Sequence, residues 1–312
     1  MVAIGMSRPI LVTGAHRSGT TWVGRVLAAD PTVGYIHEPL SPSRWPGWLR
    51  ERAPYWYLYI DRSNEDRYIG QIEQLLLFRY PLGPHLRAAR HPRQVGRVLN
   101  DFSHSLWYRA RHKRPLIKDP IGLFSSEWIA DRFDAQVVVM IRHPAAFASS
   151  VKRLAWEFGF EHWLDQPELM RAWLTPFEED MRHHARVGVD LVEQAILMWR
   201  AIYTVVDGFK ARHPEWLFVR HEDLADDPAA GYKDMYATLG LAWDDRVEKK
   251  ILATSSERNP SEVPNWRHGS VRRDSAAARR TWKKRLTHEE IDRVRTGTSD
   301  VWPLFYSDDD WD

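Results

Sequence analysis

The chain has 312 residues, enough for one large α/β domain or two smaller ones with a substantial core. Its 44 basic and 42 acidic side chains nearly cancel, which argues against binding of nucleic acid or an anionic membrane through overall charge. Cysteine is absent, which excludes disulfides, thiolate metal sites and a cysteine nucleophile; we expect a cytoplasmic protein without a signal peptide or membrane span.

Five short apolar runs, rich in β-branched residues, predict buried strands. They cover residues 9–14, 33–38, 115–120, 135–144 and 216–224. Helical patterns follow the first, fourth and fifth runs, at residues 20–30, 145–158 and 229–241. Such alternation is typical of a doubly wound parallel sheet, which binds ligands beyond the carboxyl ends of its strands. We therefore expect one P-loop-like α/β domain over residues 1–312, with about five parallel strands flanked by helices.

Two stretches interrupt this alternation. Residues 41–114 are rich in tryptophan, tyrosine, arginine and proline, and residues 157–190 carry further aromatic and acidic side chains. We expect both to be mostly helical insertions over the strand ends, where they would form the acceptor site. The acidic segment 307–312 is predicted to be a frayed tail.

The segment TGAHRSGTTW, residues 13–22, lies between the first strand and the first helix. Its glycines and hydroxyls are typical of a phosphate-binding loop at a helix N-terminus. Loops that bind a nucleoside triphosphate have a lysine where this chain has Thr20. The strand VVVMI is followed by Arg142 and not by an acid that could hold Mg²⁺. Both differences favour a ligand with less charge at its reacting end and a second phosphate bound by arginine.

The segment RHPAAFASS, from Arg142 to Ser150, is suited to that second phosphate. Pro144 predicts a helix start, so Arg142 would lie at the strand end and Ser150 about two turns into the helix. Arginine offers a bidentate, charge-assisted contact and serine a hydroxyl donor.

In these motifs the sequence resembles the sulfotransferases that use 3′-phosphoadenosine 5′-phosphosulfate (PAPS). GAHRSGTTW resembles their 5′-phosphosulfate loop, and RHPAAFASS resembles their 3′-phosphate motif. VRHEDLADDP, LGL and TWKKRLT also match in order, so the resemblance covers residues 9 to about 306. YIHEPL is similar to the carbohydrate-type and bacterial branches, in which a glutamate at this point is taken as the base.

The resemblance implies a set of donor-binding residues. These are Arg17, Ser18, Gly19, Thr20 and Thr21 at the 5′-phosphosulfate, Trp22 at adenine, and Arg142 and Ser150 at the 3′-phosphate. His221 stands where many members have tyrosine and is added to the set. Of the segment RKGxxGDWK only Trp282 and Lys283 are present, and Arg272 and Arg273 would replace its missing phosphate contacts. The product would be adenosine 3′,5′-bisphosphate (PAP), and no metal would be required.

Sulfuryl transfer to a hydroxyl is an in-line displacement in which positioning and charge stabilisation supply most of the catalysis. Glu38, at the end of the second strand, is the predicted base, with a pKa raised by partial burial. The alternative is that Glu38 only ends its strand. Arg17 and Lys118 are the predicted cations at the transferring group.

Several nearby residues are weaker candidates for the acceptor site. His37 alternates with Glu38 and is expected to point the other way, and Asp119 is expected to pair with Lys118 or to act as a second base. A stacking wall for a sugar or an aromatic ring could consist of Trp45, Trp48, Trp56 and Trp107, although these rings could equally belong to the core. The segment HEDL, residues 221–224, is expected to be scaffolding, and no histidine pattern has the spacing of a metal site.

The acceptor would be a carbohydrate or another small molecule, and the chain could act as a homodimer. Two other functions stay open. A P-loop kinase or other NTP-dependent phosphotransferase would bind ATP with Mg²⁺, whereas a sulfotransferase would bind PAP without metal. A non-catalytic nucleotide-binding protein of the same fold would bind PAP but would not use Glu38 as a base.

Overall fold

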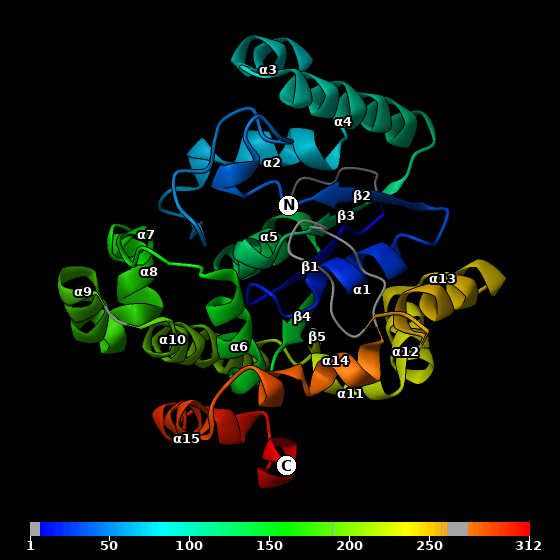
Figure 1. The fold of residues 1–312 in the computed structure, drawn as a ribbon. Helices are drawn as coiled ribbons and strands as arrows, with labels where there is room; N and C mark the ends of the chain where they lie inside the picture. Colours follow the sequence, from blue (N-terminus) through cyan, green and yellow to red (C-terminus); the bar gives the residue numbers. More distant parts are fainter. Residues whose placement is uncertain (1–6, 189, 257, 261–273) are drawn as a thin grey trace.

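A five-stranded parallel sheet lies at the centre of the protein (Figure 1). The computed structural model describes residues 7–188, 190–256, 258–260 and 274–312. The strands are β1 (Ile10–Gly14), β2 (Val33–His37), β3 (Arg114–Lys118), β4 (Gln136–Ile141) and β5 (Leu217–Arg220), in the order β2-β3-β1-β4-β5. All neighbouring strands are parallel. The predicted α/β class and the five strands are thus confirmed, but the fifth predicted run was too long: β5 ends at Arg220, and residues 221–224 begin a helix over His221–Asp226.

The strands are apolar on both faces because helices cover both faces of the sheet. Ile10 and Val12 of β1 pack into one hydrophobic cluster, whereas Leu11 packs into the other. The first cluster contains α1 (Thr20–Leu27), α12 (Pro228–Leu239) and α13 (Asp245–Ser255). The second contains α5 (Ser126–Phe133), α6 (Pro144–Leu154) and α10 (Leu191–Arg212). The predicted helices after β1, β4 and β5 correspond to α1, α6 and α12.

The carboxyl ends of the strands meet at one edge of the sheet. His37 of β2 pairs with Lys118 of β3, and Gly14 of β1 pairs with Met140 of β4. Because β1 lies between β3 and β4, the connections from β1 and from its neighbours run to opposite sides at this edge. Parallel sheets bind their ligands at such a point, beyond the carboxyl ends of the strands. The fold therefore brings the predicted site segments to a common edge.

The α-helices of the first insertion begin only at Ile69. It contains α2 (Ile69–Leu76), α3 (Leu82–Ala88) and α4 (Pro92–Ala110), but residues 45–64 form no helix or strand. Pro46 and Pro54 lack the N–H donor that a helix uses, and Trp48 and Tyr57 bury their rings in the core. The expectation of a mostly helical segment is thus wrong for residues 45–64. The second insertion is helical as predicted, with α7 (Glu161–Leu164), α8 (Pro167–Leu169) and α9 (Glu178–Val187).

The carboxyl-terminal segment is ordered, so the prediction of a frayed tail is wrong. Trp311 is 5% exposed, and its ring centroid lies 4.5 Å from that of His143. Arg220 forms an ion pair with Asp310, and Ser307 caps the final turn. One buried tryptophan thus anchors an otherwise acidic segment.

The remaining α-helices are α11 (His221–Asp226), α14 (Ser275–Arg279) and α15 (His288–Gly297). In the described parts of the chain, no helix has both the length and the apolar composition to cross a membrane.

Candidate active site

The loop between β1 and α1 has a conformation that requires glycine. Gly19 is the N-cap of α1 with φ 96°, and a Cβ atom there would lie 2.5 Å from Nδ1 of His221. Ser18 is fully buried, and its hydroxyl donates to the carbonyl of Ala15 at 2.7 Å. The first N–H groups of α1 have no partner within the helix, as at any helix N-terminus. The loop therefore has the features of an anion site next to His221.

The second predicted phosphate segment reaches this loop. Pro144 is the first residue of α6, so Arg142 directly precedes the helix cap and Ser150 lies in its second half, as predicted. Arg17 Nε donates to Ser150 Oγ at 3.2 Å. Two segments far apart in the sequence are thus joined by a direct hydrogen bond.

Positive charge is concentrated around Arg17. Desolvation is the largest cause that lowers the pKa of its guanidinium, followed by the charges of Arg153 and Arg142, with Arg285 contributing as well. Like charges at close range are unfavourable unless an anion offsets them. This concentration of guanidinium groups beside a phosphate-type loop is suited to a ligand with more than one phosphate.

Arg142 is fixed by buried partners. Its side chain is 11% exposed, and its Nε lies 3.5 Å from Oε1 of Glu222. Glu222 also accepts a hydrogen bond from the hydroxyl of Tyr306 at 2.8 Å and one from the backbone of His143 at 3.3 Å. The Arg142 N–H donates to the hydroxyl of Tyr203 at 2.7 Å. The HEDL segment therefore serves as scaffolding, as predicted, and holds Arg142 in place.

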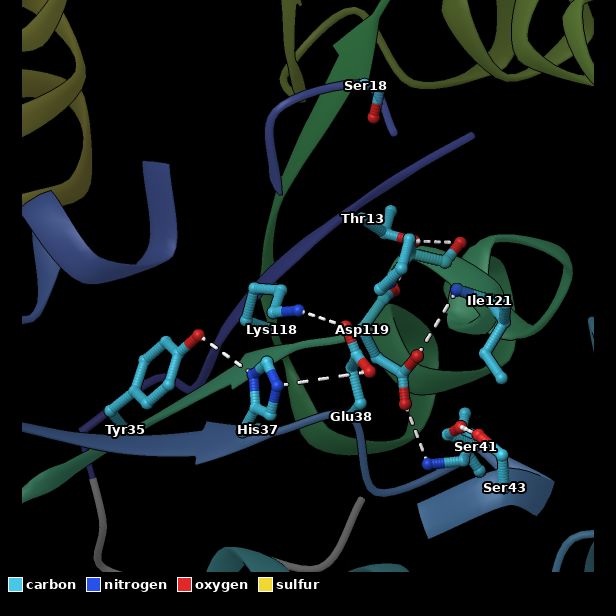
Figure 2. A network of polar contacts seen from close by, with 12 residues as sticks. Thr13, Ser18, Tyr35, His37, Glu38, Ser41, Ser43, Lys118, Asp119 and Ile121 are labelled. Atoms are coloured by element: carbon cyan, nitrogen blue, oxygen red, sulfur yellow. Dashed lines mark hydrogen bonds and ion pairs between the residues drawn. The ribbon is translucent and has the colours of Figure 1, made fainter. Parts of the chain in front are cut away.

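Glu38 and Lys118 form an ion pair at the carboxyl ends of β2 and β3 (Figure 2). Lys118 is fully buried, and the side chain of Glu38 is 28% exposed. The N–H of Glu38 also donates to the carbonyl of Lys118 at 2.8 Å. Main-chain and side-chain contacts together fix this pair at the edge of the sheet.

Burial and the ion pair have opposite effects on the pKa of each group. Burial by itself would raise the pKa of Glu38, but the Lys118 ammonium and its hydrogen bond hold that pKa at about 2. Burial lowers the pKa of Lys118, against the effect of Glu38. The sequence-based expectation of a raised pKa for Glu38 is therefore wrong, because it considered burial without the neighbouring cation.

His37 lies on the same side as Glu38. Its Nε2 is 3.9 Å from Oε2 of Glu38, and its Nδ1 shares a hydrogen bond with the hydroxyl of Tyr35 at 3.1 Å (Figure 2). Side chains alternate only within a strand, and β2 ends at His37, after which Glu38 adopts φ 47°. The expectation that His37 points away is therefore wrong. Burial first, and Lys118 second, lower the pKa of His37 to about 3, so its ring is neutral at pH 7.

Asp119 contacts backbone and forms no ion pair with Lys118. It is fully buried, and its two oxygens accept from the N–H of Leu40 at 2.7 Å and that of Ile121 at 3.2 Å (Figure 2). Burial, and then the charge of Glu38, raise the pKa of Asp119 to about 7. A buried carboxyl group with both oxygens engaged offers no contact to an acceptor. The predicted pairing with Lys118 is corrected, and Asp119 fixes the chain after β2 and β3.

The four predicted tryptophans do not form one wall. Trp48 is 4% exposed in the core, and Trp107 is 50% exposed on α4. Trp45 packs edge-on against a histidine of α3. Only Trp56 faces the loop, with its ring centroid 5.1 Å from that of His16.

His16 is a candidate site residue that the sequence analysis missed. Its ring lies 4.8 Å from Trp156 and 5.1 Å from Trp56, and its N–H donates to the hydroxyl of Tyr57 at 2.9 Å. Burial lowers its pKa to about 4, partly offset by Glu38. Its Nδ1 is buried and has no hydrogen-bond partner among the described residues. The sequence did contain a signal for His16: it lies within the loop segment GAHRSGTTW, and this loop was expected at the same sheet edge as Glu38.

Residues 9–245 match the model of a family described as the sulfotransferase family. The chain belongs to the sulfotransferase family. The match confirms the expected family and the class of enzyme, and it includes the loop, Glu38, Lys118 and the Arg142–Ser150 segment.

Known sulfotransferases match this chain over different shares of their length. Carbohydrate sulfotransferase 1 of Danio rerio is 26% identical over 188 residues, which are 59% of this chain and 38% of that protein. The sulfotransferase domain of the Synechococcus PCC 7002 olefin synthase is 16% identical, with a TM-score of 0.49 and coverage of 97% and 96% of the two chains. Mouse sulfotransferase SULT7A1, in complex with PAP, is 15% identical, with a TM-score of 0.42 and coverage of 97% and 86%.

Of the remaining predicted donor contacts, Trp22 and Lys283 lie among the described residues and two arginines lie outside them. Trp22 is 7% exposed, donates from Nε1 to Thr254 at 3.0 Å and meets His221 edge-on. Lys283 is exposed, with Nζ 5.4 Å from the ring centroid of Trp282, which stacks on His143. Arg272 and Arg273 lie outside the described residues. Among the described residues, no three histidine, aspartate or glutamate side chains are grouped so as to hold a metal ion.

Proposed function

We propose that this sulfotransferase transfers the sulfuryl group of PAPS to a hydroxyl of a carbohydrate or another small molecule. The observation that carries the proposal is the 3.2 Å hydrogen bond between Arg17 of the loop and Ser150 of the second phosphate segment. A ribose with phosphates at both its 5′ and 3′ positions would contact both segments at once. The 5′-phosphosulfate would lie against residues 17–21, and the 3′-phosphate against Arg142 and Ser150.

Glu38 would accept the proton of the acceptor hydroxyl. The acceptor oxygen would attack sulfur, the bond between sulfur and the 5′-phosphate oxygen would break, and PAP would leave. Since the pKa of Glu38 is about 2, it is ionised but weakly basic. Proton transfer would therefore come late, when the bond to sulfur has made the hydroxyl acidic.

Lys118 would stabilise the negative charge on the sulfuryl oxygens. Any movement of its ammonium from Glu38 toward these oxygens would also raise the pKa of Glu38, because burial would then be less compensated. One cation would thus couple charge stabilisation to the strength of the base. The neutral His16 and the ring of Trp56 lie on the loop side of this pair and would contact the acceptor.

Two alternative functions fit the residues of the site less well. A phosphotransferase needs a loop cation for its triphosphate and an acid for Mg²⁺, and this chain has Thr20 and Arg142 at those points. A non-catalytic protein does not need a carboxylate at this edge, whereas Glu38 here contacts a buried lysine. A cytoplasmic location, a homodimer and independence of metal stay predictions.

Calorimetry of the protein with PAP and with ATP plus Mg²⁺ tests the proposal. PAP should bind in the presence of EDTA, and far more tightly than ATP with Mg²⁺. Labelled PAPS should then pass its label to a hydroxyl within a panel of saccharides and phenols. Tight binding of ATP with Mg²⁺ and transfer of its γ-phosphate would instead establish a kinase. PAP binding without label transfer to any acceptor would support a non-catalytic protein.

A further inference from the structure

The hairpin of α3 and α4 carries an unequal share of the charge. Residues 79–113, here called the basic hairpin, contain eight basic side chains and one acidic side chain, a net charge of +7. The whole chain has a formal charge of +2, so the rest of the chain carries −5. The overall balance of charge therefore conceals a strongly basic surface element at the outside of the molecule (Figure 1).

The basic hairpin also exposes large apolar side chains. Seven large hydrophobic side chains are exposed in the described part of the chain, and four of them lie on the hairpin. These are Leu86 (39% exposed), Leu99 (49%), Leu106 (41%) and Trp107 (50%). A concentration of exposed apolar side chains in one element indicates a contact surface.

On α4 these side chains form a face of their own. The helix is buried along Val98, Asp101, Ser105 and Tyr108. At about 100° per residue, Leu99, Leu106 and Trp107 lie opposite that buried side. Arg93 and Arg109 lie at the two edges of the exposed face, and both are exposed. The helix thus has an outward apolar face bordered by arginines.

The hairpin is both basic and apolar, so its partner must accept positive charge and cover apolar side chains. A second copy of the chain would cover the leucines but would bring two elements of charge +7 together. A nucleic acid would match the charge but would leave the leucines exposed. An anionic lipid surface accounts for both features, because basic amphipathic helices place apolar side chains at the acyl boundary and arginines among the phosphates. We propose that the basic hairpin docks the protein on an anionic lipid surface.

A cavity at the hairpin turn is suited to a single head group. Its volume is about 460 Å³, and it is lined by Trp45, Arg52, Arg87, Ala88, Arg90 and Gln94, none of which is acidic. Nε of Arg52 donates to the carbonyl of Pro42 at 2.8 Å, which fixes that arginine at the rim. The three arginines in this lining are the side chains best suited to bidentate contacts with a phosphate.

Sedimentation of the full chain with vesicles tests the proposal. The protein should sediment with phosphatidylcholine vesicles that contain one quarter phosphatidylglycerol, but not with pure phosphatidylcholine, and salt should weaken this binding. Arg93→Gln/Arg109→Gln should lower the partition coefficient about fivefold per arginine. Leu99→Gln/Leu106→Gln should lower it further, while Leu252→Gln, at an exposed leucine on α13, should leave it unchanged.

PAP affinity, measured in parallel, shows that each variant is folded and separates this test from that of the proposed function. Equal sedimentation with both vesicle types, or none with either, would overturn the proposal. Dimerisation in ultracentrifugation that Leu99→Gln/Leu106→Gln abolishes would instead make a second copy the partner. Binding to duplex DNA that only the arginine substitutions weaken would make it a nucleic acid.

Discussion

Glu38 shows how one backbone angle changes the chemistry of a residue. With φ 47° it leaves the alternation of β2, so its carboxylate meets Lys118 and lies 3.9 Å from His37. The sequence predicted the position of Glu38 at a strand end, but a positive φ at a glutamate followed by proline has no signal in the residue pattern. The pKa was therefore predicted with the wrong sign.

Replacement of Lys118 by methionine tests the ion pair. The pKa of Glu38 in the folded protein is about 2, below the value it has in the unfolded chain. The ionised carboxylate therefore stabilises the fold at pH values above its unfolded pKa, and this stability is lost as the pH falls toward 2. In Lys118→Met only burial acts on Glu38, so its pKa should rise and the ionised carboxylate should destabilise the fold. Urea unfolding at pH 7 should show a loss of about 3 kcal/mol, and Glu38→Gln added to Lys118→Met should restore most of it. A double variant no more stable than Lys118→Met would refute the pairing as the cause.

Glu38→Gln tests the base. The amide cannot accept the proton, so turnover with PAPS should fall on the order of 10²–10⁴-fold while PAP affinity is kept. Steady-state kinetics with calorimetry on the same sample measure both. Normal turnover in Glu38→Gln would mean that another group takes the proton.

Gly19 is required by conformation as well as by space. Gly19→Ala places a side chain at φ 96° and 2.5 Å from His221, which should cost about 2 kcal/mol of unfolding free energy. Adding His221→Ala should recover only part of this, since the backbone strain remains. Gly96→Ala in α4, where no atom lies within 4 Å of the new Cβ, should instead stabilise by about 0.5 kcal/mol. Similar urea midpoints for Gly19→Ala and the wild type would contradict this account.

At the scale of elements, the sequence predicted what local patterns encode. The strands are apolar on both faces, as in VVVMI, and the helices begin at clear signals such as Pro144, so both were found. The tertiary contacts of single tryptophans were not predictable. A ring buried in the core and a ring that lines a ligand site can have the same neighbours in the sequence. Trp48 entered the core, whereas Trp107 lies on an outward face.

The carboxyl-terminal segment provides a matched pair of substitutions. Trp311 is 5% exposed and packs on His143 and Trp302, so Trp311→Ala should cost about 3 kcal/mol in urea unfolding. Asp308, in the same turn, forms an exposed ion pair with Arg295, so Asp308→Ala should cost less than about 1 kcal/mol. If both variants unfolded like the wild type, the segment would not be part of the folded core.

At the scale of the whole molecule, the sheet brings the two predicted phosphate segments together. The loop follows β1, the segment from Arg142 to Ser150 follows β4, and these strands are neighbours. The Glu38–Lys118 pair follows β2 and β3 on the other side of β1. Donor and acceptor sites would thus meet across the loop, a placement that follows from strand order and could not be deduced from the motifs alone.

The most direct test of the donor site compares two nucleotides in calorimetry, PAP and adenosine 5′-monophosphate, which lacks the 3′-phosphate. Arg142→Gln and Ser150→Ala should each weaken PAP binding, by roughly 10- to 100-fold for the arginine, and leave binding of the monophosphate unchanged. Equal losses for both nucleotides, or no loss for PAP, would contradict the account that Arg142 and Ser150 hold a 3′-phosphate.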